Sequence, residues 1–494
     1  MKKTVFITGA TGTMGMKTVE KFVPHTDEFN IRVLARDSAK NREKLSTFGD
    51  GIEVIWGDLK DDDKLRDGVK DADYVLAVGA FLSPFCDEVP YDALRTNYGS
   101  TLSMLKSIKE FGQEEKTHFV YIGTVAQTGD RMPPIHWGRV GDPMKPSVYD
   151  YYAVSKVFSE MAVMESGLKY RASIRQSSMM PVNPKSGEYP ILSHQPYNNV
   201  LEWSTAEDSA NLMLNICMRA PEHFWRRAYN LSNGKDFRCT TFSFYESLYQ
   251  DPRETQEPNW LATNNFHGHC YLDSDDLENV VPFRTKTFDE AMFDQLGAFM
   301  ENAMNAEPGS MPTTIEESKE NNRRIMSKPG GVLQFVADGD EERIKVWFGS
   351  REKYDAIPKD WDGCIIAKPL NLPGKPLDRG FDECKPVEEL GIDDMRQAAK
   401  FRGGECLSES MDNGDLYSPL KWRCADGHEF EACPYTVLFA GHWCPECMQD
   451  SWHYGDIAKK NPFFAQVWWP LHKDEEPYSV KMEANARDIE KLYK

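Results

Sequence analysis

The chain has 494 residues and a formal net charge of −20, from 58 Lys and Arg against 78 Asp and Glu. This length exceeds one typical domain and predicts two or three. The acidic balance argues against a nucleic-acid backbone as the principal partner. The sequence contains no stretch of about 20 apolar residues, so we expect no membrane-spanning helix. Because Met-Lys-Lys runs directly into an apolar stretch without a cleavage-site pattern, we expect a cytoplasmic protein.

The first predicted elements are a buried strand at residues 5–7 and a helix from residue 16 onward, joined by glycines at Gly9, Gly12 and Gly15. A strand, a tight glycine turn and a helix N-terminus together make a phosphate site. The glycines let the backbone approach a pyrophosphate, and the free N–H groups and the helix dipole favour its charge. The spacing is G-x-x-G-x-x-G rather than the common G-x-G-x-x-G.

Four more apolar runs follow, each separated from the next by a polar and often helix-like stretch. Strands that alternate with helices over this length predict an α/β fold with a doubly wound parallel sheet. In such a sheet, ligands bind at the carboxyl ends of the strands. The four runs are residues 31–35, 52–56, 74–78 and 118–122.

The end of the second run bears on the choice of coenzyme. In this fold an acidic residue there binds the ribose hydroxyls of NAD, whereas a nearby arginine accommodates the extra phosphate of NADP. Here the small Ala35 takes the acidic position and Arg36 follows it. The sequence therefore favours NADP, with NAD as the alternative because Asp37 can turn inward.

An acid/base pair is predicted on a helix at Tyr152-Ala-Val-Ser-Lys156. Residues four apart face the same side of a helix. A phenol with a pKa of about 10 is a poor proton-transfer group at neutral pH, and a nearby lysine cation lowers that pKa by favouring the phenolate. Thr124 closes the run at 118–122, where its hydroxyl can bond a substrate oxygen.

With these motifs, roughly the first 300 residues resemble the extended branch of the short-chain dehydrogenase/reductase superfamily, the NAD-dependent epimerase/dehydratase type. The resemblance implies a Rossmann-like fold, with Tyr152 as acid/base, Lys156 tuning it and holding the nicotinamide ribose, and Thr124 orienting the substrate. It also implies that Asp58 contacts the adenine. The segments that carry it are residues 8–15, 57–58, 97–101, Thr124, 152–156 and 202–210.

The same resemblance implies a set of coenzyme contacts and allows a homodimer, since members of this branch are often dimeric. The residues expected to contact the coenzyme are Gly9, Thr11, Gly12, Met14, Gly15, Arg36, Asp58, Leu59 and Lys156.

Two departures from the family narrow the expected chemistry. Sugar-nucleotide dehydratases of this branch usually follow the threonine with an Asp-Glu pair, but Val125, Ala126 and Gln127 follow Thr124. The segment 173–181 also diverges from the family, which puts sugar-nucleotide binding in doubt. We expect an NAD(P)-dependent oxidoreductase that transfers hydride at a carbonyl/alcohol pair of a small substrate. The alternatives are a sugar-nucleotide epimerase that uses transient oxidation, and a coenzyme-sensing binding protein.

The layout after the first domain, residues 1–305, is predicted from composition. Residues 306–330 are polar, contain proline and lack apolar periodicity, so we expect a linker. Residues 331–405 form a small α+β or irregular region, in which apolar runs at 332–336 and 344–348 predict a hairpin and 392–401 a short helix. Residues 406–450 are expected to form a small metal module and 451–494 a C-terminal tail.

Seven of the eleven cysteines lie between Cys364 and Cys447. The pairs Cys424-Ala-Asp-Gly-His428 and Cys444-Pro-Glu-Cys447 are about fifteen residues apart, which matches a tetrahedral Cys3His zinc site in a small α+β domain. The stretch resembles treble-clef and zinc-ribbon domains.

A reducing cytoplasm disfavours disulfides for these cysteines. Cys406 and Cys433 are alternative ligands, and His442 is expected to be an exposed turn residue. Four protein ligands predict a structural zinc, because catalytic zinc keeps an open position. We therefore expect the module to serve folding, assembly or partner docking and not the reaction.

Overall fold

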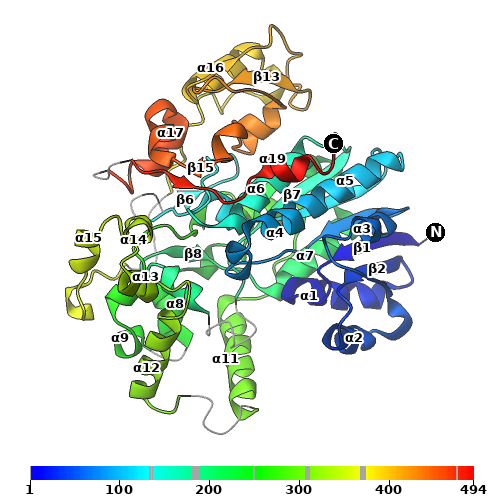
Figure 1. The fold of residues 1–494 in the computed structure, drawn as a ribbon. Helices are drawn as coiled ribbons and strands as arrows, with labels where there is room; N and C mark the ends of the chain where they lie inside the picture. The colour runs from blue at the N-terminus through cyan, green and yellow to red at the C-terminus, as the bar shows by residue number, and fades with distance from the viewer. Residues whose placement is uncertain are drawn as a thin grey trace.

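The computed structural model describes residues 2–132, 135, 137–180, 189–248, 251–305, 312–367, 374–473 and 477–494. Its centre is a seven-stranded parallel sheet of order β3-β2-β1-β4-β5-β7-β9. Helices lie around this sheet (Figure 1). The predicted doubly wound fold is confirmed, and the apolar runs expected as strands all lie in this sheet. Its strands are β1 Lys3–Thr8, β2 Phe29–Ala35, β3 Glu53–Trp56, β4 Tyr74–Ala77, β5 His118–Thr124, β7 Tyr170–Gln176 and β9 Arg227–Leu231.

Helices cover both faces of the sheet because successive strand residues point to opposite sides. Val5 and Ile7 pack toward one face, with α1 (Thr13–Phe22) and α7 (Ala206–Arg219). Phe6 packs toward the other face. The helices on that second face are α3 (Asp62–Val69), α5 (Ser100–Glu110) and α6 (Tyr151–Met164).

The remaining helices and strands of the first 305 residues are short, apart from the 17-residue α11. They are α2 Ala39–Ser46, α4 Pro90–Leu94, β6 Trp137–Gly138, β8 Val200–Glu202, β10 Arg238–Thr240, α8 Thr241–Leu248, α9 Pro252–Thr255, β11 Cys270–Tyr271, α10 Ser274–Val280 and α11 Phe288–Met304.

The hairpin predicted at residues 332–348 is wrong: the segment forms helices α13 (Val332–Asp338) and α14 (Glu341–Phe348). Gly339 ends the first helix in the left-handed region, at φ 66°, and the Asp340 side chain caps the second by accepting the Arg343 N–H. The turn residues that suggested a hairpin are therefore helix caps. The apolar side chains of both helices join one buried core.

The predicted linker also contains a helix, α12 (Ile315–Met326), which begins with a capping box between Thr314 and Glu317. Its last residues, Ile325 and Met326, are buried. Residues 306–311 of the predicted linker lie outside the described residues. The polar composition of residues 315–326 therefore reflects a helix most of whose side chains are at least partly exposed to solvent.

The C-terminal part adds a three-stranded antiparallel sheet, β12-β13-β14, and several short helices. Its Trp422 and Val437 belong to the same buried core as Phe119 of β5 and Val163 of α6. Its elements are α15 Arg351–Asp355, α16 Ile392–Phe401, β12 Glu405–Cys406, β13 Leu420–Arg423, β14 Glu429–Ala432, β15 Ser451–Trp452, α17 Tyr454–Lys460, α18 Pro462–Trp468, β16 Val480–Lys481 and α19 Ala486–Glu490.

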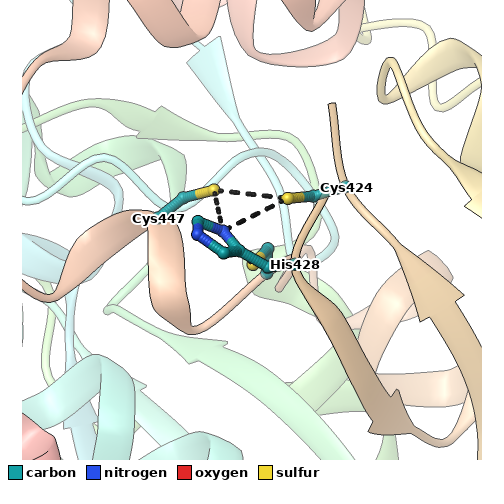
Figure 2. A group of neighbouring side chains, drawn as sticks. Cys424, His428 and Cys447 are labelled. Carbon is teal, nitrogen blue, oxygen red and sulfur yellow. Dashed lines mark hydrogen bonds between the residues drawn. The ribbon is translucent and has the colours of Figure 1, made fainter. Parts of the chain in front are cut away.

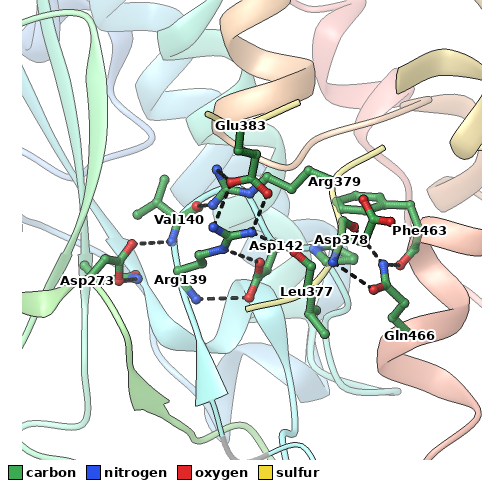
Figure 3. Close-up of polar contacts among 12 residues, drawn as sticks. Arg139, Val140, Asp142, Asp273, Leu377, Asp378, Arg379, Glu383, Phe463 and Gln466 are labelled. Atoms are coloured by element: carbon green, nitrogen blue, oxygen red, sulfur yellow. Dashed lines mark hydrogen bonds and ion pairs between the residues drawn. The ribbon is translucent and has the colours of Figure 1, made fainter. Parts of the chain in front are cut away.

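A polar cluster also joins the two halves of the chain (Figure 3). Arg139 donates two hydrogen bonds to Glu383, at 2.7 and 2.8 Å, and the Val140 N–H donates to Asp273 at 2.6 Å. Arg379, which is 7% exposed, donates to the Val140 carbonyl. Through these contacts the segment around residue 380 is fastened to the loop that precedes the predicted catalytic helix.

Among the described residues, every helix falls short of the length and apolar character that crossing a membrane requires.

Candidate functional site

The glycine turn has the geometry of a phosphate cradle. Gly9 has φ +73°, and a Cβ at this position would lie 2.5 Å from Gly79 Cα at the end of the neighbouring strand. A Cβ at Gly15 would overlap the Gly9 carbonyl oxygen. Gly12 caps α1 without a side-chain hydrogen bond, so the first helical N–H groups remain available. The turn is therefore closely packed and presents an uncapped helix N-terminus.

The end of β2 carries several cations. Asp37 accepts two hydrogen bonds from Arg42, at 2.7 and 2.8 Å, and these bonds lower the pKa of its carboxyl group. Lys44 Nζ donates to the Thr11 carbonyl at 3.0 Å, which brings a charge to the glycine turn. Arg36 is exposed beside them. The carboxylate that could select NAD is therefore engaged by an arginine.

Three other predicted coenzyme contacts surround this turn. Met14 is buried in the sheet core on α1. Asp58 is half-buried, and its Oδ1 accepts the Lys60 N–H at 3.1 Å. Leu59 lies against Gly79, since its Cδ1 would be 3.2 Å from a Cβ there. The structure thus gathers the predicted contacts at the carboxyl ends of β1, β3 and β4.

Thr124, Tyr152 and Lys156 lie together where β5 ends and α6 begins. The Tyr152 hydroxyl is within hydrogen-bonding reach of the Thr124 side chain. Lys156 is 2% exposed; its Nζ donates to the Ile122 carbonyl at 2.6 Å and lies 5.7 Å from the Tyr152 ring centroid. The threonine and lysine thus approach the phenol from β5 and from the next turn of the same helix.

Burial dominates the proton affinities of this pair. It raises the pKa of the Tyr152 phenol above its ordinary value and lowers the pKa of Lys156 to about 7. The expected depression of the tyrosine pKa by the lysine is not what this geometry gives, because desolvation of the phenolate is the largest effect and the Thr124 hydrogen bond offsets it only in part. At neutral pH the phenol is therefore protonated.

Sequence reasoning missed two carboxyl groups beside the tyrosine. Asp87 Oδ1 accepts the N–H groups of Tyr151 and Tyr152, at 2.9 and 3.4 Å, and Asp150 Oδ1 accepts the Ala153 N–H at 2.7 Å. Burial raises the pKa of both groups, and for Asp150 the charge of Asp87 adds to the effect.

An aspartate just before the helix is an N-cap signal and could have been recognised for Asp150. Nothing in the sequence places Asp87 here, because it reaches the helix from the loop after β4. The absence of carboxylates after Thr124 therefore does not leave the site without carboxyl groups.

The four predicted metal ligands are brought together, and their ligand atoms all lie within 4.8 Å of one another. His428 Nδ1 lies 3.4, 3.6 and 3.5 Å from the sulfurs of Cys424, Cys444 and Cys447 (Figure 2). In tetrahedral zinc sites, bond lengths of about 2.0–2.3 Å place the ligand atoms roughly 3.5–3.8 Å apart. The donor set and its spacing therefore fit zinc.

The other residues considered for this site lie outside the ligand group. Cys406 is not part of it. Cys433 Sγ donates to Glu165 at 3.1 Å. The prediction that His442 is an exposed turn residue is wrong, because its side chain is 1% exposed and bonds Glu160 on α6 at 2.8 Å. The sequence does not reveal that this part of the chain packs against α6, and for that reason His442 was expected to be exposed.

A cavity of about 170 Å³ lies between α8, α9 and α12, apart from all the predicted site residues. It is mostly apolar, with Phe242, Leu261, Ile325 and Trp361 among its lining residues. No residue of α6 is among those that line it, so it does not extend the site around Tyr152.

Comparison with known proteins places the first half of the chain. Residues 5–224 match the model of the NAD dependent epimerase/dehydratase family. A UDP-glucose 4-epimerase of Rickettsia bellii is 29% identical over 110 residues, which is 21% of this chain and 32% of that protein. An uncharacterized membrane protein of Methanocaldococcus jannaschii is 31% identical over 127 residues, 25% of this chain and 36% of that protein. The matches thus span about a third of these relatives' length.

Among solved structures, DesIV, a dTDP-glucose 4,6-dehydratase from Streptomyces venezuelae with NAD and TYD bound, is similar with a TM-score of 0.50. The match has 18% sequence identity and covers 62% of this chain and 99% of that one. At this identity the similarity shows the fold, which agrees with the parallel sheet and its helices.

Proposed function

Because residues 5–224 match the model of the NAD dependent epimerase/dehydratase family, we propose that this protein is an NADP-dependent oxidoreductase acting on a carbonyl/alcohol pair. The observation that carries the proposal is the convergence of Thr124, Tyr152 and Lys156 at the carboxyl edge of the sheet. The uncapped N-terminus of α1 lies at the same edge. This arrangement supports a proton donor and a pyrophosphate site at the same edge of the sheet.

The glycine turn suits a dinucleotide, since side chains at Gly9 and Gly15 would collide with neighbouring backbone and disrupt the tight turn before α1. Gly9, Thr11, Gly12, Met14 and Gly15 would hold the pyrophosphate. Asp58 and Leu59 would contact the adenine, and Lys156 the nicotinamide ribose. When bound, the coenzyme supplies or accepts a hydride. Arg36, with Arg42 and Lys44 nearby, supports NADP, because Asp37 is already bonded to Arg42 and a guanidinium suits a phosphate.

The residues of the chain account for the proton. Tyr152, protonated at neutral pH, would donate its phenolic proton to the substrate oxygen as a carbonyl is reduced to an alcohol. Thr124 would hydrogen-bond the same oxygen. Lys156, in its protonated form, would stabilise the phenolate left behind, and the Ile122 carbonyl holds its Nζ in position. In the reverse direction the phenolate would take the alcohol proton.

The rim of the site supports a neutral, partly apolar carbonyl substrate over a sugar nucleotide. Phe85 and Tyr189 pack at 5.2 Å between ring centroids beside the loop that carries Asp87. Large apolar side chains are exposed along this loop and across from it: Leu82, Phe85, Val89, Tyr91 and Tyr189.

The test is Tyr152→Phe with Tyr149→Phe as its matched control. Tyr149 neighbours the site, but its hydroxyl bonds Glu342 and no lysine follows it by four residues. Tyr152→Phe should lower turnover by about 100-fold or more while NADPH still binds in a fluorescence titration. Tyr149→Phe should retain turnover. Near-normal activity of Tyr152→Phe would end the assignment.

The second candidate is an epimerase that oxidises and then reduces the same sugar carbon. It is favoured by the relative named UDP-glucose 4-epimerase, although that match spans only 21% of this chain. An epimerase returns the coenzyme to its starting state, whereas an oxidoreductase consumes NADPH stoichiometrically. A panel of apolar ketones, aldehydes and UDP- and dTDP-sugars, followed for NADPH consumption and for isomer ratio, separates the two. Coenzyme binding without turnover of any of them would favour a coenzyme-sensing protein.

For the C-terminal cluster we propose a structural zinc held by Cys424, His428, Cys444 and Cys447. Four protein ligands leave no open position for substrate, so the metal would stabilise the module instead of reacting.

A further inference from the structure

Helix α6, which carries Tyr152 and Lys156, is gripped at its N-terminal end by the C-terminal part of the chain. The Tyr151 hydroxyl accepts the Glu483 N–H at 2.6 Å. The Tyr151 ring packs edge-on against Trp452 at 5.2 Å between centroids. Tyr151 immediately precedes the proposed catalytic tyrosine, so these contacts set the orientation of the first helical turn.

The middle of the helix is held by a buried ionic network. Glu160 lies one turn beyond Lys156 and is fully buried, and it accepts hydrogen bonds from Arg175 at 2.5 and 3.0 Å and from His442 at 2.8 Å. Arg175 also donates to the Ala440 carbonyl at 2.7 Å. Because no water reaches these groups, removing one partner leaves an uncompensated buried charge.

The C-terminal end of α6 makes a third attachment. Glu165, its C-cap, accepts the Cys433 N–H at 3.0 and 3.1 Å and the Cys433 thiol at 3.1 Å. The helix is thus tied at its start, middle and end to residues that follow the first domain. The two attachments at Glu160 and Glu165 both come from residues 433–442.

That segment is bounded on both sides by the metal ligands. His428 immediately precedes β14, which leads into Cys433, and Cys444 follows His442 by two residues. His428 Nδ1 and Cys444 Sγ, at the two ends, lie 3.6 Å apart, so the segment forms a closed loop. A Cβ at Gly441, where φ is +80°, would overlap the Asp142 carbonyl oxygen. The loop is therefore seated tightly against the first domain.

We propose that residues 433–442 form a rigid loop that supports the proposed catalytic helix α6. In this loop His442 is a positioning residue, and the zinc site closes the loop at its ends. The inference rests on the proposed function only in assigning catalysis to Tyr152. Zinc fixes the ends of the loop, the loop holds Glu160 and Glu165, and the helix then presents Tyr152 and Lys156 to Thr124. Small displacements of such groups slow turnover steeply, about 100-fold for 1 Å. The metal module therefore serves the reaction without contacting the substrate.

The first test does not depend on activity. Zinc is extracted from the full-length protein with a chelator, and amide hydrogen exchange is followed by mass spectrometry. Exchange should rise in residues 151–164 and 429–443 and return on addition of Zn²⁺, whereas α1 and the glycine turn should stay protected. Unchanged exchange in 151–164 after complete zinc loss would overturn the proposal, whatever reaction the protein catalyses.

The second test uses His442→Ala, His442→Gln and His453→Ala in the full chain. His453 is a histidine of the same region that bonds Ser451 and does not reach α6. His442→Ala should lower kcat by about tenfold to 100-fold with KM for NADPH and zinc content unchanged. His442→Gln, which keeps an N–H donor for Glu160, should recover most of kcat, and His453→Ala should match wild type.

Wild-type kcat in His442→Ala would refute the positioning role, as would failure of His442→Gln to recover activity. If His442→Ala does not fold, the exchange measurement on the wild-type chain still decides. If Tyr152→Phe remains active while zinc loss still raises exchange in α6, the proposed function is contradicted. The support of α6 by residues 433–442 is then still upheld.

Discussion

The predicted catalytic site and the metal cluster draw their parts from very different distances along the chain. Thr124 and Tyr152 come from a strand and a later helix, and Asp87 reaches them from a third segment. The four metal ligands lie on two tight turns, at 424–428 and 444–447. The first site therefore exists only when the parallel sheet is formed, whereas the second needs two short motifs and a metal ion.

The metal module, which is built from two short motifs, can therefore support the site around Tyr152, which needs the whole sheet. The loop between the two ligand turns carries the groups that bond α6. Damage to the metal site should therefore spread to α6, whereas damage to the proposed catalytic residues should stay local. The following predictions test that asymmetry.

The largest effect is expected from Cys444→Ser combined with Cys447→Ser. The variant should lose the zinc, expected at about one ion per chain in wild type, because serine does not replace a thiolate ligand. Metal-binding energy in small modules is largely folding energy, so limited proteolysis should cut around 405–450. Elemental analysis and peptide mapping provide the readouts. NADPH binding should persist; its loss would show that the two regions fold as one unit.

Glu160→Gln should be the most destabilising single change, by about 3–5 kcal/mol, since Arg175 and His442 would lose their anionic partner. Although burial raises the pKa of Glu160, the Arg175 charge and the His442 hydrogen bond hold it well below the ordinary value. A carboxyl group with a depressed folded-state pKa contributes stability above its unfolded pKa, about 4.3, and loses it as the pH falls.

The difference in unfolding free energy between wild type and Glu160→Gln should therefore be large at pH 7 and shrink below pH 4. Urea titrations at both pH values measure it. An equal difference at the two pH values would contradict the assignment of a buried carboxylate.

Lys156→Met should reduce turnover by about 100-fold and also weaken NADPH, because the lysine both supports the phenolate and holds the ribose in the proposed function. Lys169→Met provides a matched control, since Lys169 is exposed beyond the end of α6. The same zinc content and unfolding midpoint in both variants would show that damage here stays local. A structural defect spreading from Lys156→Met to the metal module would break the asymmetry.

Arg36→Ala should have the smallest effect, about tenfold or less on NADPH affinity and less on NADH. Only NADPH carries the phosphate that a guanidinium can clasp, and solvent screens an exposed charge. Parallel titrations with both coenzymes measure the change. If wild type prefers NADH, the assignment fails and Asp37 becomes the expected ribose ligand.

The prediction of a hairpin at residues 332–348 was wrong because helix caps and hairpin turns use the same residue types. Gly339 and Asp340 read as a hairpin turn, but they end one helix and begin the next. The spacing of apolar residues does not distinguish two short helices from two strands, because an apolar run of about five residues fits either one. Only the core that Val332, Phe335 and Trp347 share distinguishes the two.

The features that depend on neighbouring residues could be predicted from the sequence: the parallel sheet, the glycine turn, the Tyr152–Lys156 pair and the four proposed metal ligands. These follow from strand and helix periodicity and from the spacing of ligands on tight turns. The tertiary structure alone decided the pKa values, the approach of Asp87 to Tyr152 and the burial of His442 against Glu160. The two residues of that last contact are 282 positions apart along the chain, and desolvation depends on everything packed around a group, so no local pattern records either.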